Sequence, residues 1–67
     1  MTSTVAGLIA GSGLPLPEAR ALLAHRLGVA RERLVAHPES IVAPADAEEF
    51  VALARRRVLG EPLAYLL

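Results

Sequence analysis

The 67-residue sequence contains no cysteine, no tryptophan and no lysine, and it has one phenylalanine and one tyrosine. Without cysteine the chain has neither a disulfide framework nor a thiolate metal site. With so few aromatic residues, a hydrophobic core has to be built from Ala, Leu, Val and Ile. The sequence is therefore not that of a small disulfide-stapled domain.

An excess of charge of one sign is also absent. Seven arginines balance seven acidic residues, so the formal net charge is zero with both histidines neutral. Such a chain has no overall field that would steer it onto nucleic acid or anionic lipid. Hydrophobic residues make up 54% of the chain, which is too apolar for intrinsic disorder. The composition predicts a folded domain without a direct nucleic-acid partner.

Residues 1–17 carry no charge, which raises the question of export or membrane insertion. A secretory signal has a basic region at its start, and this segment has none. Its strongest apolar run, residues 5–10, includes Gly7 and is far shorter than the ~20 residues of a spanning helix. We expect no membrane segment and a cytoplasmic location.

The short length limits what the chain can do alone. A domain of ~60 residues buries only about 60% of its unfolded surface and is marginally stable. We expect either well-packed helices or dependence on a neighbouring domain, and no deep catalytic pocket.

Hydrophobic spacing and helix-ending residues predict an all-α fold, a small bundle of four to five helices. Gly13, Gly28, Pro38 and Gly60 each follow a predicted helix and end it. The predicted helices cover residues 4–12, 15–28, 31–37 and 44–59, with a short fifth turn near 62–65.

Apolar residues three and four apart define the faces that these helices bury. The predicted central cluster is Leu23, Leu27, Leu34, Phe50 and Ala54. Further residues expected to point inward are Val5, Leu8, Ile9, Val35, Ile41, Val42, Ala47, Val51 and Val58.

No pattern of catalytic, cofactor-binding or metal-ligating residues is present. Glu48 and Glu49 are neighbours, so on a helix they point about 100° apart and cannot flank one substrate atom. His25 and His37 fall on different helices without an acidic cluster, which does not favour a metal site. The segment 11–13 lacks the preceding strand and the Lys-Ser/Thr pair of a phosphate loop.

Residues 56–67, Arg-Arg-Val-Leu-Gly-Glu-Pro-Leu-Ala-Tyr-Leu-Leu, resemble the Arg-Arg-x-x-Gly-Glu-Pro-x-x-Tyr segment of the HemK-type family. These proteins are the S-adenosylmethionine-dependent methyltransferases that modify the glutamine of peptide-chain release factors. Residues 18–28, 33–39 and 44–50 resemble successive helices of the same family in order. The resemblance covers residues 16–67.

The resemblance implies that this chain is the N-terminal domain of a larger protein. Residues 1–60 would form the helical bundle, and 61–67 would begin the linker to an absent catalytic domain. The cofactor loop and the Asn-Pro-Pro-Tyr catalytic motif belong to that domain in the family. This chain would therefore be non-catalytic, whereas the full-length protein would use S-adenosylmethionine.

The resemblance also implies a substrate-recognition role. The bundle would help to hold the release factor so that its Gly-Gly-Gln loop reaches the catalytic domain. Candidate contacts with the release factor or the catalytic domain are Arg56 and Arg57, on the family's Arg-Arg pair, together with Glu61 and Tyr65. We expect Arg56 to point away from the core and Arg57 to lay its stem along the core edge.

Two alternatives remain open. The chain could be a helical packing module that only stabilises a neighbouring domain, its arginines being solvated and loosely paired with acids such as Glu61. It could also be a helix-turn-helix DNA binder, although Glu32 and Glu39 offset the arginines of the short candidate recognition helix.

Overall fold

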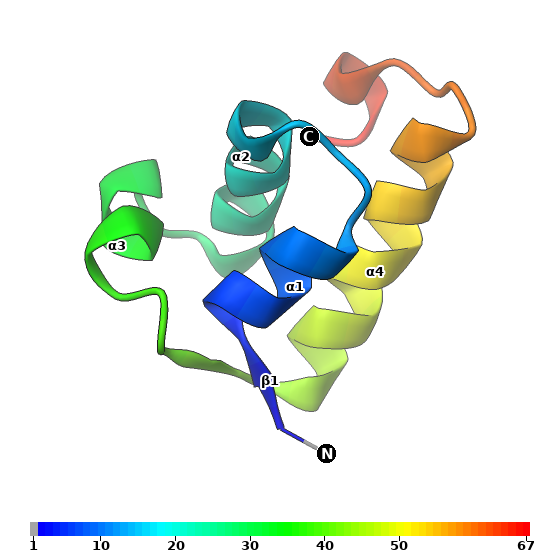
Figure 1. The fold of residues 1–67 in the computed structure, drawn as a ribbon. Coiled ribbons are helices and arrows are strands. Elements are labelled where there is room, and N and C mark those ends of the chain that lie inside the picture. Colours follow the sequence, from blue (N-terminus) through cyan, green and yellow to red (C-terminus); the bar gives the residue numbers. More distant parts are fainter. Residues whose placement is uncertain (1) are drawn as a thin grey trace.

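The computed structural model describes residues 2–67, in which four α-helices are joined by a two-stranded sheet and followed by a terminal 3₁₀ turn (Figure 1). The elements in chain order are β1 (Ser3–Thr4), α1 (Val5–Gly11), α2 (Leu16–Leu27), α3 (Arg31–Ala36), β2 (Ile41–Val42), α4 (Pro44–Val58) and η1 (Leu63–Tyr65). The predicted all-α class is confirmed, and η1 is the predicted fifth turn.

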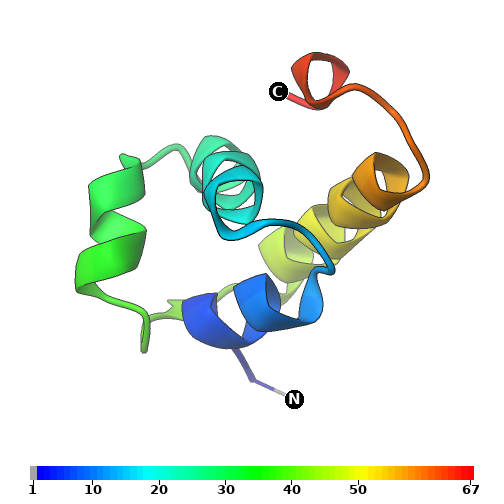
Figure 2. The ribbon, with the colours of Figure 1, turned by 45° about the horizontal axis from the view of Figure 1, so that its top comes forward.

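Helix α2 is the central element. It lies between α3 and α4, with α1 packed across both α2 and α4 (Figure 2). Its C-terminal end is Gly28, which has a φ of 69° and donates its backbone N–H to the carbonyls of Ala24 and His25. Because this left-handed conformation favours glycine, the turn into α3 depends on Gly28.

The backbone N–H groups in the first turn of α1 find hydrogen-bond acceptors both in the Thr4 side chain and in the loop before α4. The Oγ1 of Thr4 accepts a hydrogen bond from the N–H of Gly7 at 3.0 Å, as expected of an N-cap. The N–H groups of Val5 and Ala6 donate to the carbonyls of Ser40 and Pro38 at 3.0 and 2.9 Å. These donors have no partner within a helix, so they anchor the loop before α4 to the start of α1.

The loop predicted for residues 38–43 contains strand β2, which pairs antiparallel with β1. Ser3 lies opposite Val42, and Thr4 lies opposite Ile41. Side chains alternate between the two faces of a strand, so Val42 is buried while Ile41 is 72% exposed. The prediction of an inward Ile41 is wrong for this reason.

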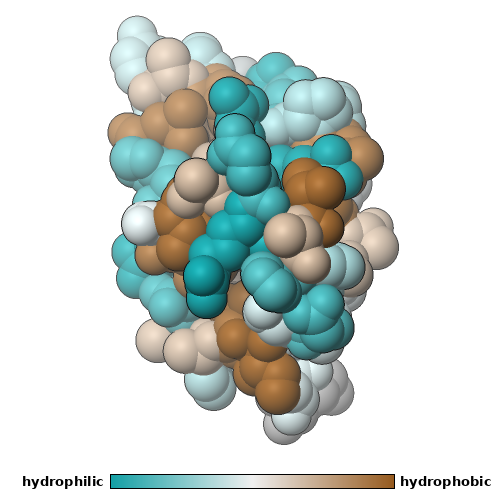
Figure 3. Space-filling model, turned by 90° about the vertical axis from the view of Figure 1, so that its left-hand side faces the viewer, coloured by the Kyte–Doolittle hydropathy of each residue, from teal (hydrophilic) through white to brown (hydrophobic). Residues whose placement is uncertain are grey.

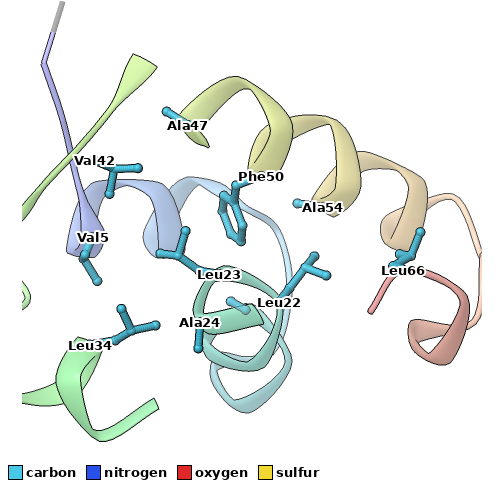
Figure 4. Close-up of a cluster of buried hydrophobic side chains, with 11 residues drawn as sticks. Val5, Leu22, Leu23, Ala24, Leu34, Val42, Ala47, Phe50, Ala54 and Leu66 are labelled. Atoms are coloured by element: carbon cyan, nitrogen blue, oxygen red, sulfur yellow. The ribbon is translucent and has the colours of Figure 1, made fainter. Parts of the chain in front are cut away.

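The core forms between α2 and α4. Phe50 points from α4 towards Leu22 and Leu23 of α2 (Figure 4). These three residues have the largest fully buried side chains of the core. The predicted central cluster is confirmed except that Leu27 lies partly buried at its edge. The other buried hydrophobic residues are Val5, Ala19, Ala24, Leu34, Val42, Ala47, Ala54 and Leu66.

Three valines predicted to point inward are instead exposed. Val35 is 56% exposed because the six-residue α3 buries only Leu34. Val51 and Val58 on α4 are 48% and 57% exposed. They line a hollow whose α1 side is formed by Gly7, Leu8 and Gly11, so α1 offers few side chains to cover them.

Among the described residues, no helix has the length and apolar character needed to cross a membrane. On the side where α3 lies in Figure 1, hydrophobic patches are separated by hydrophilic residues (Figure 3).

Candidate interaction site

Three consecutive arginines, Arg55, Arg56 and Arg57, occupy the last turn of α4. Positive side chains there interact favourably with the negative end of the helix dipole. Because successive residues are about 100° apart around a helix, the three guanidinium groups have different surroundings. Two of them form ion pairs within the chain.

Arg57 connects α4 to α2. Its Nε lies 2.7 Å from Oε1 of Glu18, and its Nη1 donates to the carbonyl of Glu61 at 3.3 Å. The Arg57 and Glu18 side chains are only 32% and 28% exposed. The Arg57 guanidinium therefore forms an ion pair between two helices of the bundle.

Arg56 pairs with the segment that follows α4. Its Nε lies 2.8 Å from Oε2 of Glu61, and both side chains are about half exposed, at 53% and 43%. The N–H of Glu61 also donates to the carbonyl of Arg56 at 3.1 Å. Arg56, Arg57 and Glu61 thus form one cluster, which we name the C-terminal cluster.

Tyr65, the fourth candidate, lies on η1 and is 81% exposed. The next residue, Leu66, is 6% exposed and belongs to the hydrophobic core. The segment after α4 is therefore fixed by the Glu61 ion pair and by Leu66, and it presents Tyr65 to solvent.

The structure adds a surface that the sequence analysis missed, along the seam between α1 and α4. Two adjoining hollows of about 360 Å³ each share Leu8, Val51 and Arg55. We name them together the α1–α4 groove. Its other lining residues are Ser3, Gly7, Gly11, Ser12, Gly13, Ala47, Glu48, Phe50, Ala52, Ala54, Val58 and Leu59.

A sequence signal for this groove exists in the two glycines of α1. Gly7 and Gly11 are four residues apart and so share a helix face that carries no side chain. An α4 residue beside that face cannot be covered by α1. The prediction that Val51 and Val58 of α4 point inward did not consider this face of α1 without side chains.

Arg55 is the one arginine of the trio that lines the groove. It is exposed and takes part in none of the four ion pairs that residues 2–67 form. An exposed cation beside apolar surface can bind a carboxylate of a partner.

Within residues 2–67, no three His, Asp or Glu side chains come together as metal ligands. His37 lies 3.5 Å from Glu39, and His25 is on a separate helix. The same part of the chain buries no polar or charged side chain. What the described residues offer is contact surface, namely the C-terminal cluster, Tyr65 and the α1–α4 groove.

Comparison with known proteins relates the chain to a family. The family model described as the PrmC N-terminal domain matches residues 8–67, which begins earlier than the resemblance over 16–67 and includes part of α1. No solved structure matches the chain.

Three curated relatives all carry the name release factor glutamine methyltransferase. The protein of Bordetella pertussis is 50% identical over 60 residues, covering 90% of this chain and 22% of the relative. That of Aliivibrio fischeri is 43% identical over 56 residues, covering 84% of this chain and 20% of the relative. That of Burkholderia pseudomallei is 39% identical over 64 residues, covering 96% of this chain and 22% of the relative. The chain thus spans about a fifth of the length of these relatives.

Proposed function

We propose that this chain, which belongs to the PrmC N-terminal domain family, is the non-catalytic recognition domain of a protein methyltransferase that acts on peptide-chain release factors. The family match over residues 8–67 is the observation that carries the proposal. The shared identity with three release factor glutamine methyltransferases supports it. In this proposal the protein meets its substrate in the cytoplasm.

The methyl transfer itself would belong to the rest of the full-length protein. That part would bind S-adenosylmethionine and methylate the glutamine of the Gly-Gly-Gln motif. The present chain would contribute binding energy remote from the reacting atoms, which helps to orient the glutamine at the catalytic site.

We further propose that residues 1–60 are the recognition bundle and that 61–67 begin the connection to the catalytic domain. The ion pair between Arg56 and Glu61 and the burial of Leu66 support a fixed direction for this segment. Tyr65 and the C-terminal cluster are then the candidate contacts with the catalytic domain.

The proposal is tested by deleting residues 1–60 from the full-length enzyme and measuring methylation of the release factor. We expect KM for the release factor to rise with a smaller change in kcat, since the domain adds binding more than chemistry. As a control, S-adenosylmethionine binding to the truncated enzyme should be unchanged.

The isolated chain provides a second measurement. Calorimetric titration with the release factor should show saturable binding, whereas S-adenosylmethionine should give no heat of binding. If the chain binds no release factor and its deletion only destabilises the enzyme, it is a packing module without a partner of its own.

A further inference from the structure

We propose that the α1–α4 groove is the surface that binds the release factor, and that it accepts a short amphipathic helix carrying a carboxylate beside its apolar stripe. This inference rests on the function proposed above and assigns that function a surface. It differs from the C-terminal cluster, which we assign to the contact with the catalytic domain.

The dimensions of the groove suit a helix. Along α4 it extends from Ala47 to Leu59, with Val51 and Arg55 between them at intervals of four residues. At 1.5 Å per residue this spacing corresponds to roughly 18 Å, or about three helical turns. An amphipathic helix places its apolar anchors at i, i+3, i+4 and i+7, a span that a groove of this length can hold.

The groove is apolar and uncovered. Val51, Val58 and Leu59 are 48%, 57% and 79% exposed along one side. On the other side, a Cβ atom placed on Gly11 would have no neighbour within 4 Å, so this position is open to an approaching chain. A partner that covers these residues removes their apolar surface from water, which favours binding.

Charge determines which kind of partner fits. Glu18 and Glu61 already pair with Arg57 and Arg56, whereas Arg55 has no such partner in the described chain. Glu48 lines the same hollow as Arg55, so the surface is not basic as a whole. This arrangement suits an apolar helix with an acidic residue near Arg55 and disfavours the nucleic-acid phosphate backbone.

The test compares two groove variants with two matched controls in calorimetric titrations of the chain with the release factor. Arg55→Glu reverses the unpaired charge, and Val51→Ser removes an apolar contact. Arg31→Glu and Val35→Ser make the same changes on α3, where Arg31 is exposed and Val35 is 56% exposed. Thermal unfolding followed by circular dichroism tests whether each of the four variants folds.

We expect each groove variant to raise Kd about tenfold or more, because a charged or apolar anchor is lost from the interface. Each α3 control should change Kd by less than about twofold, as expected away from the interface. The Kd of the unaltered chain should also rise with ionic strength more steeply than that of Arg55→Gln.

A second measurement covers the case in which a groove variant fails to fold. Adding the release factor to the isotopically labelled, unaltered chain should shift the amide resonances of Leu8, Val51, Arg55 and Leu59. Shifts centred on α3 or on Tyr65 would overturn the assignment.

The remaining outcomes separate this inference from the proposed function. If the unaltered chain binds and both groove variants bind equally well, the groove is wrong and the recognition role stands. If the unaltered chain does not bind, the recognition role is wrong and the groove assignment fails with it. If sedimentation shows a dimer that Arg55→Glu dissociates, the occupant is a second copy of this chain and the proposal is overturned.

Discussion

Arg57 and Glu18 are 39 positions apart in the sequence, yet the Nε of one lies 2.7 Å from the Oε1 of the other. Glu18 lies in the first turn of α2 and Arg57 in the last turn of α4. Each side chain therefore complements the dipole of its own helix as well as the charge of the other. The pair fixes how the end of α4 lies against the start of α2.

We predict that Arg57→Ala lowers the free energy of unfolding by about 1 kcal/mol, whereas Arg56→Ala changes it by less than about 0.5 kcal/mol. Arg57 loses a less exposed ion pair, a bond to the Glu61 carbonyl and the packing of its stem. Arg56 loses only a pair that is half exposed. Urea unfolding measures both, and equal effects would contradict the difference in role.

Phe50→Ala should unfold much of the population. Substitutions of a buried Phe by Ala cost about 3–5 kcal/mol, which is comparable to the whole stability that a core of this size supplies. Phe50→Leu should cost less because it leaves a smaller void. Leu59→Ala, at a position that is 79% exposed, is the control and should move the urea midpoint little. A midpoint for Phe50→Ala near that of the unaltered chain would exclude Phe50 from the core.

Substitutions at the N-cap positions of α1 and α4 should change the stability in opposite directions. Thr4→Ala removes the bond to the Gly7 N–H and should destabilise the fold by about 1 kcal/mol, whereas Thr4→Ser should retain most of it. At the start of α4, Ala43 makes no side-chain cap bond, so Ala43→Ser should stabilise by a similar amount. Thermal unfolding measures all three, and a neutral Ala43→Ser would mean that packing alone determines the start of α4.

Two glycines differ in what their backbone requires. Gly28 has a left-handed φ of 69°, so Gly28→Ala should cost about 1 kcal/mol despite the open space around it. Gly11 ends α1 without a positive φ and also faces open space, so Gly11→Ala should be neutral or stabilising by up to about 1 kcal/mol. The difference between the two urea midpoints tests this interpretation.

The helices could be predicted from sequence because their signals are local. Gly28 ends α2, Pro44 starts α4 and Thr4 caps α1, and each acts within a few residues of its position. The central core was also predictable, because Phe50 and Ala54 are four residues apart on one face of α4.

The wrong predictions of buried residues arise where a second helix or strand determines whether a side chain is covered. Helical spacing places Val51 beside Phe50, but it does not reveal that two of the α1 residues facing it, Gly7 and Gly11, carry no side chain. The exposure of Ile41 follows from its pairing with Thr4, far away in the sequence. The groove was therefore missed, although Leu8, Val51 and Val58, which line it, were predicted as core residues.

The contact with the catalytic domain yields the last prediction. Tyr65 is 81% exposed, so Tyr65→Ala should leave the stability of the isolated chain within about 0.5 kcal/mol of its original value. In the full-length enzyme, the same change should separate the unfolding of the bundle from that of the catalytic domain, because an exposed aromatic ring commonly anchors an interface. Scanning calorimetry measures this as the splitting of one transition into two. Tyr65→Phe is the matched control and should preserve a single transition, since it keeps the ring and removes only the hydroxyl. If Tyr65→Ala leaves the full-length transition unchanged, η1 does not contact the catalytic domain, and the connection rests on the C-terminal cluster alone.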